Sequence, residues 1–365
     1  MPTTNNIVYH NQEKTSITSS TSSSWTLHET VMSSNNLTAG RTYLALAWFN
    51  CFSPGTNEGG TKLAFEGAGG DLVGSVQQRH DTNSSGMYIG HLGKFVAPSP
   101  VENIGVYRRR LYNGGNAETT ECGQFFCIDL TGPTGLESGT DYVLDENTTL
   151  RTVATNGTIV SVTNTTSGSC LVMTSTKCHG PDGTPTLIGL YIDGVLKASG
   201  SRWTQDGQDQ HQVLLGGAYN LSSGDDISLK NLDPTASTMN YTCVFALNLA
   251  EAGSSVTGSV ASWTDNTTSG TWGSVNMGSG GPSFVVGVGR QLGAGPDSGR
   301  AASISLKNTT SDSWMLFSSR PSGDLDPFYF PATNYGTDVG QLESTVVIGT
   351  TTVGTGNDTV EMITT

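Results

Sequence analysis

The sequence predicts an all-β fold of two to three tandem antiparallel β-sandwich modules, jelly-roll-like and with almost no helix. Short runs rich in Val, Ile, Thr and aromatic residues recur along the 365 residues, bounded by clusters of Gly, Asn, Asp and Ser, as in a sandwich or barrel. No stretch of about a dozen residues carries apolar side chains at helical spacing. The 47 glycines interrupt almost every helical candidate, each at a cost of about 1 kcal/mol in a helix interior.

The expected strands share β-branched and aromatic residues and end at turn residues. In chain order they are Thr42–Phe52, Gly86–Val96, Ile104–Leu111, Gly123–Leu130, Leu187–Ile192, Gln212–Tyr219, Tyr241–Leu249, Ser283–Gly289, Ala301–Leu306, Trp314–Ser318 and Thr345–Val353.

Two connections carry hairpin chemistry. Asp193-Gly194 lies between Ile192 and Val195 and predicts a type I′ turn, because both central residues of that turn need a positive φ. The run Tyr112–Asn116 reads Tyr-Asn-Gly-Gly-Asn and predicts a second hairpin between the strands around it.

A short segment that occurs twice indicates internal repetition. Ile227–Asn231 returns unchanged as Ile304–Asn308, and each copy leads through a polar turn into an aromatic-containing strand. Ile104–Leu111 followed by Cys122–Leu130 is a looser third version. We therefore expect a first module with an N-terminal arm, a second module, and a less regular third module with a Gly/Thr-rich tail, at residues 1–150, 151–255 and 256–365.

Composition excludes several classes of protein. The net charge is −14 and no basic run is longer than Arg108–Arg110, so nucleic acid is not an expected partner. No window approaches the roughly 18 apolar residues of a membrane span, and Met1–Asn6 lacks the basic start of a signal peptide, so we expect a protein made in the cytoplasm. Six cysteines are too few for a disulfide scaffold. Cys51, Cys127 and Cys243 lie in apolar strand-like runs and are expected to be buried, whereas Cys170 and Cys178 could pair across a hairpin.

Catalytic motifs are missing from the sequence. It has no G-x-S-x-G, H-E-x-x-H or P-loop, and Gly287–Gly293 is one residue too long for a dinucleotide-binding turn. We expect no catalytic residues, no metal and no cofactor. Ca²⁺ is an alternative at three acidic turns, which ordinary turn chemistry also explains. These turns contain Asp206 with Asp209, Asp225 with Asp226, and Asp324 with Asp326.

Trp203 stands apart from the other tryptophans, which are expected to fill module cores. It lies in a polar stretch that predicts a loop or an exposed strand end, beside Arg202, Gln205 and Asp206. An exposed Trp next to these polar groups suits sugar stacking or a subunit contact, so these four residues form the candidate contact set for a glycan or a partner protein.

The order of strand-like runs resembles that of the tandem jelly-roll and β-sandwich structural proteins of tailed bacteriophage virions. In the first module the runs that carry the resemblance are Tyr43–Trp48, Thr61–Glu66, Gly86–Leu92, Ile104–Arg108 and Phe125–Leu130, followed by Leu136–Tyr142. The resemblance implies a non-enzymatic virion protein of the decoration, head-fibre or tail-associated type, most simply a capsid decoration or head-appendage protein. Its partners would be the major capsid or tail protein of the same particle and further copies of itself.

Two other functions stay open. One is a carbohydrate-binding adhesin or tail receptor-binding protein, with a cell-surface glycan as ligand at the Trp203 set. The other is a polysaccharide-degrading enzyme, because a glycosidase pair of carboxylates comes from distant strands and leaves no local signature.

Overall fold

The computed structural model describes a defined part of the chain. Its backbone description covers residues 7–10, 18–20, 22–52, 59–75, 77–79, 86–110, 118–132, 135–179, 184–204, 211–249, 270–276, 281–292, 304–308, 313–316, 342–353 and 359–364. Its side-chain description covers residues 22–47, 60–75, 91–109, 125, 127–132, 135–178, 186–199 and 213–249. Apart from one 3-10 helix, Ser34–Asn36, the regular elements in these ranges are strands, which confirms the all-β prediction. Within them, no helix has the length and apolarity that crossing a membrane requires.

The first sandwich consists of two antiparallel sheets. Its strands are β1 (Ile7–His10), β2 (Thr18–Ser20), β3 (Thr26–Met32), β4 (Thr42–Phe52), β5 (Gly59–Phe65), β6 (Gln77–Arg79), β7 (Gly86–Val96), β8 (Ile104–Arg110) and β9 (Glu118–Asp129). One sheet has the order β1-β9-β4-β7, with β2 also paired to β9; the other has the order β3-β8-β5-β6. The chain passes back and forth between the two sheets, which is a jelly-roll arrangement.

The second sandwich repeats this topology strand by strand. Its strands are β10 (Tyr142–Asn147), β11 (Arg151–Val153), β12 (Thr158–Thr163), β13 (Gly168–His179), β14 (Thr184–Ile192), β15 (Val195–Thr204), β16 (His211–Leu221), β17 (Asp226–Asn231) and β18 (Ser237–Asn248). The sheet orders are β10-β18-β13-β16, with β11 also paired to β18, and β12-β17-β14-β15. Each strand therefore occupies the position of the strand nine numbers earlier, and the tandem prediction is confirmed.

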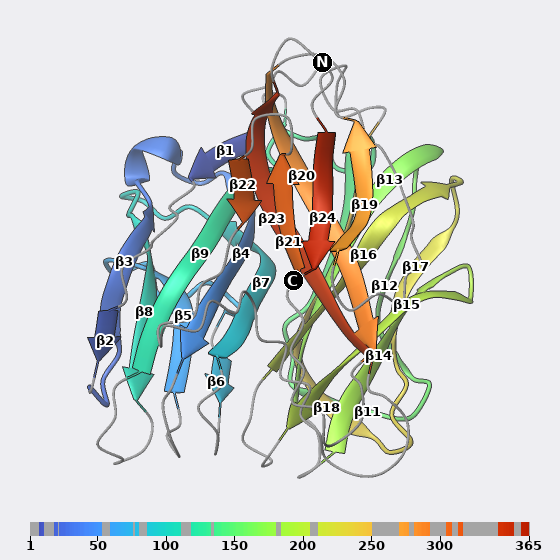
Figure 1. The fold of residues 1–365 in the computed structure, drawn as a ribbon, viewed down its shortest axis with the longest axis horizontal. Coiled ribbons are helices and arrows are strands. Elements are labelled where there is room, and N and C mark those ends of the chain that lie inside the picture. The colour runs from blue at the N-terminus through green and yellow to red at the C-terminus, as the bar shows by residue number, and fades with distance from the viewer. Residues whose placement is uncertain are drawn as a thin grey trace.

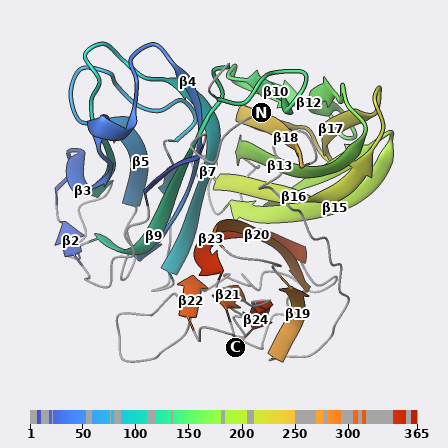
Figure 2. The ribbon, with the colours of Figure 1, turned by 90° about the horizontal axis from the view of Figure 1, so that it is seen from above.

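The third module has, among the described residues, one four-stranded sheet and one two-stranded sheet. Its strands are β19 (Gly270–Asn276), β20 (Gly281–Leu292), β21 (Ile304–Asn308), β22 (Ser313–Leu316), β23 (Leu342–Val353) and β24 (Thr359–Thr364). One sheet has the order β19-β24-β21-β22, and the other pairs β20 with β23. Figures 1 and 2 show β20 and β23 beside the second sandwich, where β23 contacts β15 and β16.

Each of the first two sandwiches has its own apolar core between its sheets. In the first, buried Tyr43 and Phe125 from one sheet meet Met32 and Ile104 from the other. The corresponding core residues of the second include Val172, Leu215, Ile188 and Leu229. Burial of a large apolar side chain stabilises the fold by about 1.5–3 kcal/mol, so each sandwich has a core that favours a compact unit.

The Asp193-Gly194 turn is confirmed. Asp193 has a φ of 49° and Gly194 a φ of 73°, and they join β14 to β15 as the hairpin. The second predicted hairpin is wrong. Tyr112–Asn116 lies outside the described residues, but β8 before it pairs with β3 and β5, whereas β9 after it pairs with β1, β2 and β4. The connection therefore crosses from one sheet to the other.

The repeated pentapeptide does not mark equivalent strands. Ile227–Asn231 lies in β17, and the next strand, β18, belongs to the opposite sheet. Ile304–Asn308 forms β21, which pairs directly with the following strand, β22. The true counterpart of β17 followed by β18 is β8 followed by β9, the pair that the sequence shows only as the looser version.

The strand ranges bear on two further expectations. β10 precedes residue 151 yet belongs to the second sandwich through its pairing with β18; where the modules divide along the chain stays a prediction. Cys170 and Cys178 form no disulfide and are both buried on the same strand, β13, so the alternative of a disulfide across a hairpin is wrong.

Candidate functional site

The predicted contact residues lie at the far end of β15. Arg202 stands opposite Thr186 and Trp203 opposite Pro185 in the pairing with β14, so the strand end, rather than a loop, is the correct alternative for these two residues. Their side chains lie outside the described part, and so do Gln205 and Asp206 altogether. The role of this set stays a prediction.

The outer face of the first sandwich carries a cluster of aromatic and charged side chains that the sequence did not reveal. The Lys62 Nζ atom lies 4.9 Å and the Arg109 Cζ atom 4.6 Å from the centroid of the Trp25 ring. Lys62 Nζ is also 5.7 Å from the Tyr107 ring. These distances are within the range of cation–π contacts, about 6 Å. We call Trp25, Lys62, Asp71, Tyr107 and Arg109 the Trp25 cluster.

Strand alternation explains why this cluster forms. In β8, Ile104 and Val106 point into the core, so Tyr107 and Arg109 lie on the outer face. Lys62 of β5 is the direct cross-strand partner of Tyr107, which brings its ammonium group over the aromatic rings. Trp25 was expected to fill the core, but it stands just before β3, only partly buried and outside the core.

Carboxylates surround the cluster. Asp71 Oδ1 lies 2.5 Å from Lys62 Nζ, with the lysine side chain 13% and the aspartate side chain 43% exposed. Such a surface ion pair adds little stability, but it fixes where the ammonium group lies. Partial burial, with the negative charges of Glu66, Asp71 and Glu102, raises the pKa of Tyr107, so its hydroxyl group is neutral near pH 7.

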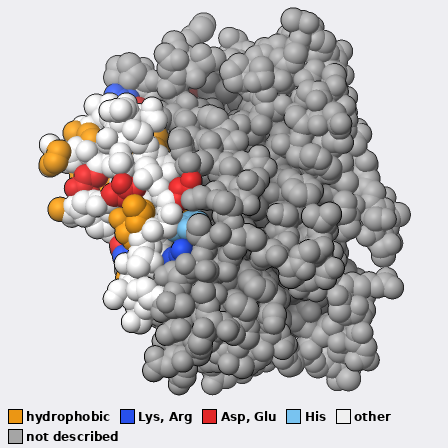
Figure 3. All heavy atoms as spheres, turned by 60° about the vertical axis from the view of Figure 1, so that its left-hand side comes forward, with side chains coloured by type: hydrophobic (Ala, Val, Ile, Leu, Met, Phe, Trp, Pro, Cys, Tyr) orange, Lys and Arg blue, Asp and Glu red, His pale blue; other side chains and the backbone are white. Residues whose placement is uncertain are grey.

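The turn beside the cluster is held by one carboxylate. Glu102 accepts hydrogen bonds from the backbone N–H groups of Gly67, Ala68 and Gly69, at 3.1, 2.8 and 2.9 Å. These hydrogen bonds, that of Gly69 first, lower the pKa of Glu102. Figure 3 shows hydrophobic, acidic and basic side chains gathered on one face of the first sandwich. Such a surface offers N–H donors next to an aromatic ring, which suits hydroxyl or carboxylate groups of a ligand or partner.

The second sandwich carries a related pair on the same two strand positions. Lys230 Nζ of β17 lies 4.6 Å from the centroid of the Tyr191 ring on β14. Because β14 and β17 correspond to β5 and β8, the lysine and the tyrosine have exchanged strands between the sandwiches. An alignment of the strands of the first sandwich with those of the second would have identified both the Lys62–Tyr107 and the Lys230–Tyr191 pair. Residue spacing along the chain did not identify them.

A polar cluster that is partly buried lies where the first sandwich meets the second, and we call it the joint. Glu146 of β10 lies at its centre. Its Oε1 atom accepts a hydrogen bond from the Tyr241 hydroxyl group at 2.6 Å and from the Lys94 backbone N–H at 2.7 Å, and its Oε2 atom lies 3.2 Å from Lys94 Nζ. The Tyr241 ring stacks on His91, with 6.3 Å between centroids.

Two glycines make room for Tyr241. A Cβ atom on Gly74 would lie 2.3 Å from the Tyr241 ring, and one on Gly93 would lie 2.5 Å from its hydroxyl oxygen. Tyr241 is 1% exposed, so β18 of the second sandwich inserts this side chain against β7 and the turn at Gly74 of the first. The two jelly rolls are therefore held by more than their covalent link.

Burial controls protonation at the joint. It lowers the pKa of Lys177, on β13, to about 8. Burial, with the positive charge of Lys177, lowers the pKa of His91 to about 3, and His91 Nδ1 has no hydrogen-bond partner within the described part of the chain. Near pH 7 His91 is therefore neutral. For both His91 and Lys177, loss of hydration makes the charged form less favourable.

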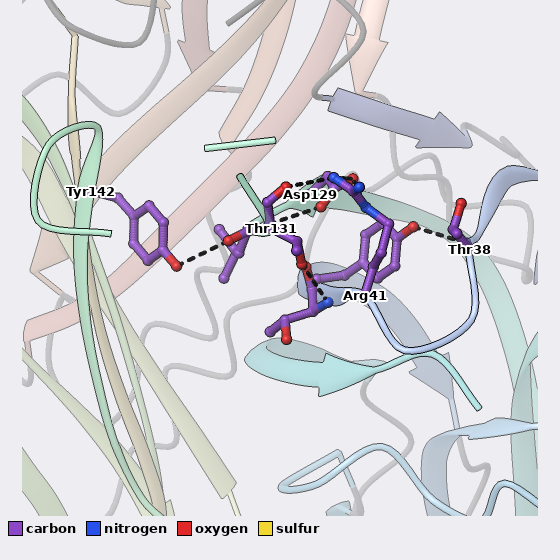
Figure 4. Close-up of polar contacts among 8 residues, drawn as sticks. Thr38, Arg41, Asp129, Thr131 and Tyr142 are labelled. Carbon is purple, nitrogen blue, oxygen red and sulfur yellow. Dashed lines mark hydrogen bonds and ion pairs between the residues drawn. The ribbon is translucent and has the colours of Figure 1, made fainter. Parts of the chain in front are cut away.

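The chain segment that leads from the first sandwich to the second is also anchored (Figure 4). Arg41 Nε donates to Asp129 Oδ2 at 2.7 Å, and Arg41 Nη2 donates to the Thr131 carbonyl oxygen at 2.5 Å. The Tyr142 hydroxyl group donates to the Leu130 carbonyl oxygen at 3.3 Å. These contacts tie the end of β9 to the starts of β4 and β10, which restricts rotation between the sandwiches.

The acidic turns offer no metal centre among the residues whose side chains are described. Asp225 accepts a hydrogen bond from the Ser222 backbone N–H, and the Asp226 backbone N–H donates to Asp193, as in an ordinary turn. In those same residues, no group of three His, Cys, Asp or Glu side chains is placed to hold a metal ion. Asp206, Asp209, Asp324 and Asp326 lie outside the described part, so Ca²⁺ there stays an alternative.

No protein-family model matches the chain, and no curated protein matches it. Among the solved structures that are similar to it, three share little sequence identity with it and have low TM-scores. The CBM22-1–CBM22-2 tandem domain of Paenibacillus barcinonensis Xyn10C has 11% identity, with 66% of this chain and 97% of that chain covered, and a TM-score of 0.22. PNGF-II has 10% identity, coverage of 67% and 66%, and a TM-score of 0.25. A chain of the Sulfolobus turreted icosahedral virus has 7% identity, coverage of 96% and 89%, and a TM-score of 0.20. All three TM-scores are too low to assign a function to this chain.

Proposed function

We propose that this chain is a non-enzymatic structural protein of a tailed-phage virion, a capsid decoration or head-appendage protein that acts by multivalent protein–protein contact. The observation that carries the proposal is the joint, where Tyr241 of one jelly roll is buried against another of the same topology. A rigid array of similar units presents several surfaces at a fixed spacing. On a symmetric particle, such spacing adds avidity without a tight single contact.

Exposed apolar tips support a contact role. Val195 is 55% and Leu196 46% exposed at the β14–β15 hairpin, and Leu150 is 60% exposed. Burial of such apolar side chains against a partner favours association. The partners in this proposal are the major capsid or tail protein of the same particle and further copies of this chain, and the protein is located on the virion.

Quantitative mass spectrometry of the purified native particle tests the proposal. Copies on the order of hundreds per particle indicate decoration of the head, and a few to about a dozen indicate a collar, fibre or tail tip. A chain that is absent from purified particles contradicts the virion role. A double variant, Val195→Ser with Leu196→Ser, is expected to fold normally and to occupy fewer sites on particles that lack the protein.

The Trp25 cluster favours a second candidate, a carbohydrate-binding adhesin or receptor-binding protein. Its aromatic ring, flanked by Lys62 and Arg109, has the donors and the apolar face that sugar binding uses. Glycan-array binding tests this role. Loss of binding in Trp25→Ala places the glycan at the Trp25 cluster, and loss in Trp203→Ala places it at the predicted set, with Val195→Ser as the control that retains binding. Release of sugar, abolished by a single carboxylate substitution, would instead identify an enzyme.

A further inference from the structure

The third module packs against the second sandwich in the way that the second packs against the first. The sheet order β19-β24-β21-β22 repeats β3-β8-β5-β6 and β12-β17-β14-β15, so the pair β20-β23 corresponds to β4-β7 and β13-β16. Between the first two sandwiches, β7 contacts β13 and β16, and β6 contacts β16. Between the second sandwich and the third module, β16 contacts β20 and β23, and β15 contacts β23. Each contact of the first set therefore has its counterpart in the second set.

The register of the strands β7, β16 and β23 repeats as well. Shortly before its end, each of them has a glycine that pairs with an apolar residue of the neighbouring strand. These pairs are Gly93 with Ala45, Gly217 with Val172, and Gly349 with Val285. A Cβ atom on Gly93 would lie 2.5 Å from the Tyr241 hydroxyl oxygen, so this glycine lets the second sandwich approach the first. The repeated glycine thus lies on the strands through which the modules meet.

The repeated contact arranges the modules around one centre. Because each interface joins two different surfaces in the same way, each module is turned by a similar rotation relative to the module before it. Figure 2 shows the result: β7, β16 and β23 lie towards the centre, and β3, β17 and β19 lie towards the outside. The chain therefore has approximate three-fold symmetry, like a trimer of β-sandwich modules that is built from one polypeptide.

We propose that this chain binds at three-fold axes of the coat, with one chain over three coat subunits. This inference rests on the proposed function, because it specifies where on the particle the chain binds. Three similarly placed surfaces contact three similarly placed coat subunits at once, and each contact raises the effective concentration of the next. The net charge of −14 favours basic groups on the coat surface that the chain covers.

The stoichiometry at saturation tests this arrangement. The full chain is added in excess to particles that lack it, unbound chain is removed, and quantitative mass spectrometry gives the molar ratio of chain to coat protein. We expect about one chain per three coat subunits, and electron cryo-microscopy of the same particles is expected to show the chain on the local three-fold axes.

The outcomes separate this inference from the proposed function. A ratio of about one to one or about one to six, or density away from the three-fold axes, would overturn the three-fold placement and leave the virion role intact. A chain that is absent from native particles contradicts the virion role itself, and the three-fold placement with it.

A matched pair of variants tests whether the spacing of the modules matters. Gly93→Ala places a Cβ atom against Tyr241 and displaces the second sandwich from the first, whereas a Cβ atom on Gly132 meets no atom within 4 Å. We expect half-saturation of the particles to need at least about tenfold more of the Gly93→Ala chain, and Gly132→Ala to bind like the natural chain. Equal binding by the two variants, both folded by circular dichroism, would contradict simultaneous contact with three subunits. If Gly93→Ala does not fold, the stoichiometry of the natural chain decides.

Discussion

Replacement of Tyr241 by Phe tests the joint most directly. The substitution keeps the ring packed against His91 and Gly74 and removes only the hydroxyl group that donates to Glu146 at 2.6 Å. A hydrogen bond to a charged group contributes about 1.5–3 kcal/mol, and at 1% exposure no bulk water replaces it. We expect the free energy of unfolding to fall by that amount, which lowers Tm by about 3–12 °C for a unit of this size.

Thermal unfolding of the full chain measures the effect, and hydrogen exchange in β7 and β18 locates it. Tyr191→Phe is the matched control, because Tyr191 lies on an outer face of the second sandwich and contacts Lys230 through its ring. We expect the control to change stability by less than about 0.5 kcal/mol. Equal Tm values for the two variants would refute the role assigned to the hydroxyl group.

A double-mutant cycle separates this contact from general loss of packing. Tyr241→Phe and Glu146→Ala, which removes the acceptor, are measured alone and together, and we expect a coupling energy of about 0.5–3 kcal/mol. A coupling energy of zero would show that the hydroxyl group and the carboxylate do not interact.

Four further predictions concern protonation and local backbone structure. The pKa of His91 is about 3 in the folded protein and 6.5 without burial, so the unfolded chain binds the proton at a higher pH. The free energy of unfolding therefore falls as the pH is lowered from about 6.5 to 3. We expect His91→Gln to remove this part of the decline, as measured by urea unfolding. The pKa of Lys177 is about 8 in the folded protein against an ordinary 10.5. The free energy of unfolding therefore rises by about 1.4 kcal/mol per pH unit between about pH 8 and 10.5. We expect this rise to be absent in Lys177→Met, and we expect that variant to be more stable than the natural chain at pH 7. Gly194→Ala forces a side chain into a φ of 73° and lowers the free energy of unfolding by about 1 kcal/mol, measured by urea titration. Glu102→Gln speeds amide exchange at Gly67–Gly69, and unchanged exchange would contradict the role of the carboxylate.

Local sequence patterns located many strands and one turn. The limits predicted for Thr42–Phe52 and Gly86–Val96 coincide with β4 and β7, because β-branched and aromatic residues end there at turn residues. The type I′ turn at Asp193-Gly194 follows from backbone sterics alone, because the two residues of the turn themselves determine which φ values are allowed. These features depend on short-range physics, so the sequence alone suffices for them.

β13 escaped prediction for a reason that lies in its surroundings. It reads Gly-Ser-Cys-Leu-Val-Met-Thr-Ser-Thr-Lys-Cys-His, which alternates poorly between apolar and polar residues. One of its faces lies on the core, where Cys170 and Val172 pack, and the other holds buried Lys177 near the joint. With both faces covered, no polar–apolar period remains in the sequence.

The Trp25 cluster could not be predicted from spacing. Trp25, Lys62 and Arg109 lie on three segments far apart in the chain, and only the sheet order β3-β8-β5-β6 brings them together. The pentapeptide shared by β17 and β21 led to a wrong prediction of equivalent strands, because similar local sequences here occupy different positions in the topology. Both are interior strands of four-stranded sheets, so the same local preferences suit both places, although the two strands hold different positions in their modules.

Position in the topology, rather than sequence identity, therefore decides which residues are equivalent, and it gives the ninth strand two roles. In the second sandwich, β18 completes its sheet by pairing with β13, and it also supplies Tyr241 to the joint with the first sandwich. In the first sandwich, β9 pairs with β4 in the same position, and Asp129 at its end binds Arg41 beside the segment that leads to the second sandwich. The same position in the topology therefore completes a sheet in both sandwiches and also supplies a polar side chain near the junction between them.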